Sequence, residues 1–210
     1  MELLEAVDAP SREVLLSLAT PFHIQTYLDS LPYIGEDLNR SPLRVVQDGH
    51  CHCLDGGMLA AAALERIGFL PLLLDLVPVP GVDDDHVLAV FQINGLWGAV
   101  AKSNFTGLRY RDPVYRSLRE LVMSYFEVFY NIDGIKTLRG YTRPLNLRSF
   151  ARFHWQTQQA GSDRIVQKLY ALKPVPVVPD YSIPLIERLD SRSLEVGFIG
   201  VNRDGLYKPH

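Results

Sequence analysis

The sequence is poor in several features that define protein classes. It contains only two cysteines, Cys51 and Cys53, and a disulfide across a single intervening residue would be strained. No apolar run approaches the roughly 20 residues of a membrane-spanning helix. The first residues are acidic and lack the basic, apolar and small-residue order of a signal peptide. We therefore expect a cytoplasmic protein with free thiols and no membrane partner.

The sequence also has no large excess of positive or negative charge. The formal net charge is −3, and charged residues make up 21% of the 210 residues. Nucleic-acid-binding domains carry a basic patch or stripe, so we expect no nucleic-acid partner. The hydrophobic share of 47% is ordinary for a globular protein, and a chain of this length buries about 70% of its unfolded surface. A stable core is therefore expected without disulfides.

Helical spacing of apolar residues dominates the first quarter of the chain. It predicts helices over residues 11–19 and 22–31, with Ser11 and Thr20 as candidate N-caps. Residues 41–46 are predicted to be extended and to lead into the two cysteines. The amino-terminal region is therefore expected to be mainly helical.

The middle of the chain predicts one buried helix and three strands. An alanine-rich helix is expected to begin near Cys53 and to end at Gly68. Residues 69–77 form a short apolar run that suits a buried strand. Residues 86–93 and 96–102 are joined by an Asn-Gly pair, the preferred type I′ turn of a β-hairpin. We expect these strands to face the buried helix.

The remainder of the chain is less regular in pattern. Helices are predicted over residues 114–130 and 162–172. Residues 173–179 contain three prolines and are expected to be extended. The tail from Tyr181 onwards carries too many apolar residues for a free linker, and we expect it to pack on the body as a cap.

The most informative residue is Cys53, at the start of the predicted buried helix. A helix N-terminus carries about half a positive charge, and such sites lower a thiol pKa from about 8.5 towards 3.5–7.5. His86 opens the first hairpin strand, directly after three aspartates at 83–85. A thiol and an imidazole so placed predict a nucleophile with its general base. The aspartates themselves form either a solvated loop or a negative field that raises the pKa of His86.

Three motifs follow one another within residues 45–105, roughly a quarter of the chain. They are Cys53-Leu54-Asp55 before the alanine-rich helix, Asp85-His86 at a strand start, and Gly95-Leu96-Trp97 in the next strand. Together they resemble the core of the transglutaminase-like superfamily, which has the papain-like fold. The resemblance implies thiol acyl-transfer chemistry, although that superfamily includes peptidases, deglycosylases, protein cross-linkers and inactive homologues. The flanking segments are similar to a group of uncharacterised bacterial proteins.

The third catalytic position departs from the superfamily pattern. An aspartate usually follows the tryptophan by four residues, and here that position is Ala101, which cannot orient an imidazole. We expect Asn104 to orient His86 instead, as an asparagine does in papain-like proteases, with Ser103 and Asp112 as alternatives. A turn residue such as Asn104 otherwise caps its own backbone.

Gln47 precedes Cys53 by the same spacing as the oxyanion-hole glutamine of papain-like enzymes. The resemblance implies that its side-chain amide joins the Cys53 N–H in stabilising a tetrahedral oxyanion. The alternative is an exposed loop glutamine with no part in chemistry.

We therefore predict an α+β fold of papain- or transglutaminase-like type, a helix-rich envelope around a small antiparallel sheet. One domain is expected over residues 1–210, with its core at about 41–130. The predicted function is cysteine-dependent acyl transfer, as a hydrolase or a transferase, on a peptide, protein or small amide and without a cofactor. The alternatives are a non-enzymatic binding protein and a zinc-binding module that uses His50, Cys51, His52, Cys53, Asp55 and His86.

Overall fold

The computed structural model describes residues 2–36 and 38–207. Four helices precede the cysteines, and their bounds are α1 Glu2–Ala6, α2 Ala9–Ser17, α3 Pro21–Ser30 and α4 Pro42–Asp48. The Thr20 hydroxyl accepts a hydrogen bond from the His23 N–H at 3.1 Å, which confirms the predicted N-cap of α3. The cap of α2 is Asp8 rather than Ser11, because the Asp8 carboxylate accepts from the Ser11 N–H at 2.9 Å.

The segment predicted to be extended at residues 41–46 is helical instead. Ser41 caps α4 with its hydroxyl, which accepts from the Arg44 N–H at 3.4 Å. Pro42 occupies the first helical position, where its missing N–H costs nothing. Gly49, at φ 70°, then ends the helix in the left-handed region and turns the chain towards the cysteines.

Helix α5 (Cys53–Arg66) begins at the predicted residue and is buried from Cys53 to Leu64. Gly68, at φ +97°, follows its end as expected. Small side chains let α5 approach the sheet closely, since a Cβ on Gly57 would lie 3.0 Å from a Val87 methyl. The helix therefore fixes Cys53 at one end of a tightly packed interface.

All strand pairs are antiparallel. The strands run in the order β4-β3-β2-β1-β5-β7, and β6 also pairs with β1. Asn94 (φ 52°) and Gly95 (φ 80°) form the turn between β2 and β3, so the predicted hairpin is confirmed. The bounds are β1 Leu72–Pro78, β2 His86–Ile93, β3 Leu96–Val100, β4 Arg111–Tyr115, β5 Leu138–Tyr141, β6 Leu145–Asn146 and β7 Val175–Pro176.

The single helix predicted over residues 114–130 is wrong. The chain there forms the end of β4, helix α6 (Leu118–Met123) and a 3₁₀ turn at Phe126–Val128. Ser117 ends the extended segment and caps α6, since its hydroxyl accepts from the Glu120 N–H at 3.1 Å. A further 3₁₀ turn, Thr106–Leu108, joins β3 to β4.

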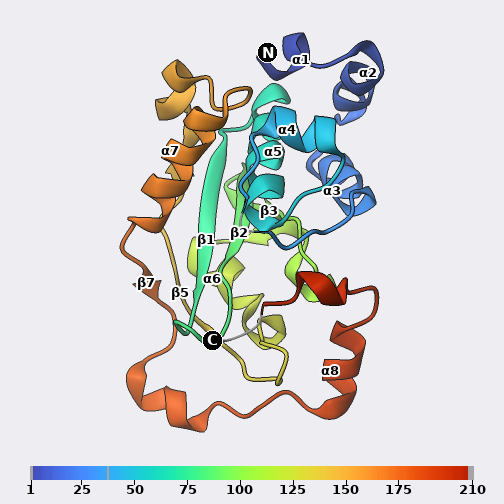
Figure 1. Cartoon of the computed structure of the whole chain (residues 1–210). Coiled ribbons are helices and arrows are strands. Elements are labelled where there is room, and N and C mark those ends of the chain that lie inside the picture. Colours follow the sequence, from blue (N-terminus) through green and yellow to red (C-terminus); the bar gives the residue numbers. More distant parts are fainter. Residues whose placement is uncertain (1, 37, 208–210) are drawn as a thin grey trace.

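The sheet is covered on both faces. Val87, Ala89 and Phe91 of β2 pack in one hydrophobic cluster with α5. Leu88 and Val90 point the opposite way and pack in a second cluster with α6. Figure 1 shows α5 on one side of β1 and β2, with α4 beside it. The structure is therefore α+β with a small antiparallel sheet and surrounding helices, as predicted at that level.

The carboxyl-terminal third wraps around this body. Its elements are the 3₁₀ segment Leu147–Phe153, α7 Gln159–Tyr170, the 3₁₀ segment Asp180–Leu185, α8 Ser191–Gly197 and the 3₁₀ turn Arg203–Gly205. Figure 1 shows the orange-to-red chain passing from β7 along the bottom of the molecule to α8 and back towards the middle. The tail packs only in part, because Leu185 and Ile199 remain 76% and 66% exposed.

Candidate functional site

Cys53 lies at the wall of a cleft. It is the first residue of α5, and 9% of its surface is exposed. It borders a cleft of about 490 Å³ and a smaller adjoining cavity of about 60 Å³. Its Sγ lies 3.9 Å from the backbone oxygen of Asp85, at the point where the chain enters β2. The sulfur is therefore fixed against the start of a strand but reachable from the cleft.

The surroundings keep this thiol protonated. Burial raises the pKa of Cys53 well above its ordinary value, and the charges of Asp85 and Asp84 raise it further. A hydrogen bond from the Val87 N–H acts in the opposite direction. The thiol pKa of Cys53 is therefore raised by burial and by the aspartates, and the positive helix terminus does not lower it as the sequence had predicted. Cys51 is fully buried, and burial raises its pKa to about 12.

His86 lies on the face of the sheet opposite to α5. In the β1–β2 register Leu76 pairs with His86 and Asp75 pairs with Val87, so Val87 faces α5 and His86 faces the second cluster. The His86 Nε2 is hydrogen-bonded to the Leu108 backbone oxygen at 2.7 Å. Burial lowers the His86 pKa to about 4. The expected rise in the His86 pKa is therefore wrong. Cys53 and His86 both border the small cavity, and in the structure the imidazole is hydrogen-bonded to Leu108.

The residues expected to orient His86 are engaged elsewhere. The Asn104 Oδ1 accepts from the Asn202 N–H, and its Nδ2 donates to the Asn202 oxygen, both at 2.8 Å. The Ser103 hydroxyl accepts from the Phe105 N–H at 3.0 Å within its own turn. Asp112 is exposed on β4. Leu108, through its carbonyl, holds the imidazole in place of the predicted Asn104.

Gln47 is placed outside the cleft. It lies on α4 and is exposed, and it is not among the described residues that border the two cavities at Cys53. The geometry therefore corrects its expected place in an oxyanion hole. The segment before the cysteines was predicted to be extended but forms helix α4, which ends at Gly49. The Gln47 side chain therefore lies on the exposed side of this helix.

A buried pair of carboxyl groups lies beside Cys53. Asp75 is 4% exposed, and its side chain lies close enough to that of Asp85 for one carboxyl group to change the pKa of the other. No donor from the other described residues reaches Asp75 Oδ1 or Asp85 Oδ2. One proton held between the two groups satisfies both oxygens, as in other buried carboxyl pairs.

Burial raises the pKa of both carboxyl groups, and the charge of Asp75 raises that of Asp85 further. The pair therefore retains a proton at neutral pH while carrying one negative charge. Sequence reasoning missed Asp75, and the available signal was a lone aspartate in the middle of the apolar run 69–77. The three consecutive aspartates are also not simply solvated, because Thr137 donates to Asp83 at 2.5 Å and Asp85 is half-buried.

Tyrosines and further carboxylates complete the larger cleft. Tyr33, Tyr170 and Tyr207 border it, together with Glu36 and Asp204. Burial raises the pKa of Tyr33, and the nearby charge of Asp85 raises the pKa of both Tyr33 and the more exposed Tyr170. Both hydroxyl groups are therefore neutral hydrogen-bond donors at physiological pH.

The zinc-binding alternative finds no ligand set in the described ranges. There, no group of three or more His, Cys, Asp or Glu side chains is arranged to hold a metal ion. His50 lies 3.5 Å from Glu36, His52 lies 3.3 Å from Asp55, and His86 is on the far face of the sheet. Within residues 2–36 and 38–207, no helix is long and apolar enough to span a membrane.

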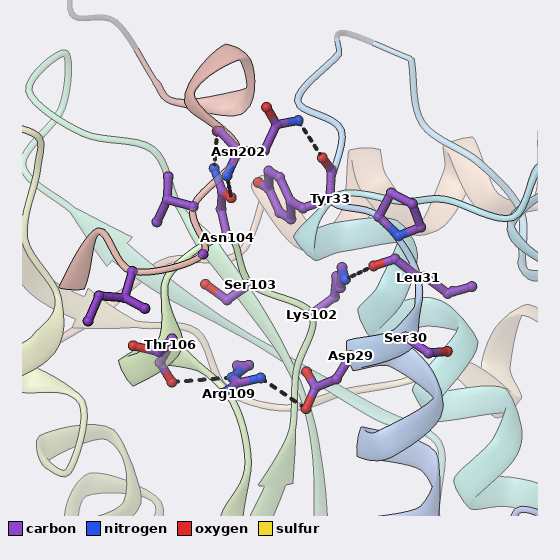
Figure 2. Close-up of a pocket in the computed structure, with 14 residues that line it drawn as sticks. Asp29, Ser30, Leu31, Tyr33, Lys102, Ser103, Asn104, Thr106, Arg109 and Asn202 are labelled. Carbon is purple, nitrogen blue, oxygen red and sulfur yellow. Dashed lines mark hydrogen bonds and ion pairs between the residues drawn. The ribbon is translucent and has the colours of Figure 1, made fainter. Parts of the chain in front are cut away.

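A second pocket of about 590 Å³ adjoins the cleft and is drawn in Figure 2. Arg109 pairs with Asp29 at 3.1 Å at one end of it. Buried Lys102 donates to the backbone oxygen of Leu28 at 2.8 Å and also to that of Leu31, at the end of α3. The far wall is formed by residues 199–202 of the carboxyl-terminal chain.

Comparisons with known proteins give little further guidance. No family model matches the chain, and no curated protein does. Among solved structures, Legionella pneumophila LapG is similar with a TM-score of 0.36 and 14% identity, over 48% of this chain and 68% of LapG. EGTA-treated LapG gives 0.35 and 14%, over 48% and 66%. Likeness at this level carries no argument about chemistry, which must come from the site.

Proposed function

We propose that this chain is a cysteine-dependent acyl-transfer enzyme with a papain-like arrangement of its core. Cys53 attacks the carbonyl of a peptide, protein or small amide, and the singly charged Asp75–Asp85 pair accepts the thiol proton through Asp85. The observation that supports the proposal is the position of Cys53 at the cleft wall, where its sulfur lies 3.9 Å from the backbone oxygen of Asp85, a residue whose side chain belongs to a carboxyl pair and borders the same cleft. A thiol and a proton acceptor thus meet where a substrate has access.

The proton balance of the pair suits this role. A neutral thiol is a poor nucleophile, so attack requires its proton to leave as the sulfur–carbon bond forms. At neutral pH the Asp75–Asp85 pair holds one proton and one negative charge, and its remaining carboxylate, with a pKa raised towards the working pH, takes the thiol proton. The proton then passes to the departing amine as the carbon–nitrogen bond breaks.

Release of the acyl group follows the same path in reverse. Water attacks the thioester, Asp85 accepts the proton of the water, and the Cys53 thiol recovers its proton as the sulfur–carbon bond breaks. In a transferase an amine replaces the water. The N-terminus of α5, with its partial positive charge and unpaired N–H groups, stabilises the oxyanion in both steps.

The test uses p-nitrophenyl acetate as an acyl donor, with stopped-flow release of nitrophenolate and mass spectrometry of the protein. We expect one acetyl group on Cys53 in the wild type and in Cys51→Ser, and none in Cys53→Ser. Asp85→Asn removes the proton acceptor and is expected to lower the acylation rate at least about tenfold, within the range for general acid–base groups. Asp84→Asn, an exposed neighbour, is the matched control.

A second measurement separates proton transfer from charge. Asp85→Asn leaves the negative charge of the pair on Asp75, which raises the thiol pKa less than Asp85 does, so alkylation of Cys53 by iodoacetamide is expected to become faster while acylation becomes slower. If both rates rise in Asp85→Asn, the carboxylate acts only through its charge, and its role as a base is rejected.

One observation favours a second candidate, a binding protein without catalytic activity. The Cys53 thiol is protonated and the imidazole of His86 faces away from it, so a thiolate–imidazolium pair does not form. A correctly folded wild type that gains no acetyl group would favour this candidate over the enzyme.

A further inference from the structure

A short carboxyl-terminal segment, residues 201–207, crosses the cleft and is called the strap here. Val201 and Asn202 form part of the wall of the pocket in Figure 2. Gly205 and Tyr207 border both cavities that Cys53 borders. Tyr33 lines all three. The three hollows therefore form one groove along the Tyr33 segment, and the strap lies across it.

Main-chain contacts hold the strap in this groove. The Asn104 side chain accepts from the N–H of Asn202 and donates to its carbonyl, both at 2.8 Å. The Asn202 amide in turn donates to the Tyr33 carbonyl at 2.9 Å. Figure 2 shows Asn202 hydrogen-bonded to Asn104 on one side and to Tyr33 on the other. Asn104 thus binds the two backbone groups of the residue that caps the Arg203–Gly205 turn, and any residue except proline offers both groups at that position.

Gly205 fills a slot that has no room for a side chain. A Cβ on Gly205 would lie 3.1 Å from the Gly35 nitrogen and 3.1 Å from the Tyr33 ring. A Cβ on Gly35 would lie 3.0 Å from the Gly205 Cα. Contacts this short force neighbouring atoms to move, and the Gly35 side of the slot is backbone. The slot therefore selects a glycine in whatever segment occupies it.

We propose that this groove binds a polypeptide segment with glycine in the Gly35–Tyr33 slot, and that the strap occupies it as an internal competitor. The ligand class is a peptide with its backbone bound by Asn104 and a glycine three residues later, as in the strap. The proposal rests on the proposed function, because it names the substrate class of the same cleft. A bound strap limits access to Cys53, and a competing peptide must displace it.

The first test measures alkylation of Cys53 by iodoacetamide in the full-length chain. Gly205→Val forces the strap out of the slot, and Asn104→Ala removes both bonds to Asn202 by another route. We expect each variant to label at least about tenfold faster than the wild type, the change that a loss of ~1.4 kcal/mol produces in a two-state equilibrium. Arg203→Ala, an exposed strap residue, is the matched control and is expected to label at the wild-type rate.

The second test asks whether the vacated groove selects glycine. An acetylated peptide with the sequence VNRDGLY is added to the Gly205→Val protein, and to Asn104→Ala if Gly205→Val does not fold. The peptide is expected to slow Cys53 labelling in Gly205→Val. In Asn104→Ala, which lacks the side chain that binds the peptide backbone, the peptide is expected to bind less tightly. The same peptide with valine in place of glycine is expected to bind at least about tenfold more weakly, measured by fluorescence anisotropy.

Two results would overturn the inference. One is labelling of both Gly205→Val and Asn104→Ala at the rate of Arg203→Ala, and the other is equal binding of the glycine and valine peptides. Neither readout requires turnover. If the strap controls labelling but no acetyl group ever forms on Cys53, then the catalytic proposal fails while the glycine-selective groove stands. If Cys53 is acetylated but either of these two results is obtained, the groove proposal fails alone.

Discussion

At the scale of single residues, His86 is a neutral buried imidazole whose protonation opposes folding. Burial lowers its pKa from 6.5 to about 4. Below pH 6.5 the unfolded chain binds this proton and the folded chain does not, so stability is lost as the pH falls from about 6.5 to about 4. The shift corresponds to about 3 kcal/mol, because one pKa unit is 1.36 kcal/mol.

The prediction is tested with His86→Gln and urea unfolding between pH 4 and 7. At pH 7 the wild type is expected to be the more stable protein, because the variant loses a buried hydrogen bond worth about 1 kcal/mol. That advantage is expected to shrink or reverse by pH 4. His23→Gln changes an exposed histidine and is expected to leave the pH profile unchanged. A constant difference between wild type and His86→Gln across this range would contradict the prediction.

The two thiols should differ in reactivity although both are protonated. Cys53 borders the cleft, whereas Cys51 is fully buried beneath it with a pKa of about 12. Iodoacetamide at pH 6.5 is therefore expected to modify Cys53 first, as measured by peptide mapping over time. Cys53→Ser should abolish the fast phase and Cys51→Ser should leave it intact. Faster modification of Cys51 would refute the assignment of Cys53 as the reactive thiol.

The site was only partly predictable from the sequence, for a reason visible in strand β2. The helix-start position of Cys53 follows from caps and composition. The direction of the His86 side chain does not, because residues 87–91 are apolar at every position and both faces of the sheet are covered. Alternation is the signal that assigns a face, and a strand buried on both faces lacks it. The partner that Asp85 finds in Asp75 depends on the same register.

At the scale of secondary-structure elements, helix α5 packs closely against the chain that follows β3. A Cβ on Gly56 would lie 2.3 Å from the Cβ of Lys102. Gly56→Ala is therefore expected to destabilise the protein by about 1–3 kcal/mol, the usual cost of overpacking, despite a gain of up to about 1 kcal/mol in helix propensity. Urea unfolding measures the difference.

Gly57→Ala provides the matched control for this prediction. It carries the same gain in helix propensity, but its Cβ would meet a Val87 methyl at 3.0 Å rather than another Cβ at 2.3 Å. The expected order of stability is wild type, then Gly57→Ala, then Gly56→Ala. A Gly56→Ala protein as stable as Gly57→Ala would show that α5 can move away from Lys102 without loss.

Elements with local signals were predictable and those set by tertiary pairing were not. The Asn94-Gly95 turn fixes its own hairpin, and Thr20 caps its own helix. Two signals were local but misjudged, since Ser41 followed by proline begins α4 and Ser117 with Glu120 begins α6. Strand β4 pairs with β3 through a shifted register, and neither its position nor its edge role follows from residues 111–115 alone.

At the scale of the whole molecule, the chain divides into a densely packed body and a lightly attached carboxyl-terminal third. The strands β1 and β2 and helix α5 are buried almost throughout. Residues 180–200 instead keep large apolar side chains exposed, including Tyr181 at 81% and Leu185 at 76%. Local opening is favoured where few apolar contacts must be broken.

Hydrogen exchange should therefore show a gradient in the native state. Amides of α5 and β2 are expected to exchange only through global unfolding, and those of residues 180–200 through local opening at much lower free energy. The Asn202 amide is the informative exception, because the Asn104 side chain accepts its hydrogen bond at 2.8 Å. In Asn104→Ala its protection should fall to that of residues 180–200, while α5 and β2 stay unchanged. Equal protection of Asn202 in both proteins would mean that the strap is held by its other contacts, chiefly Gly205 against Gly35 and Tyr33.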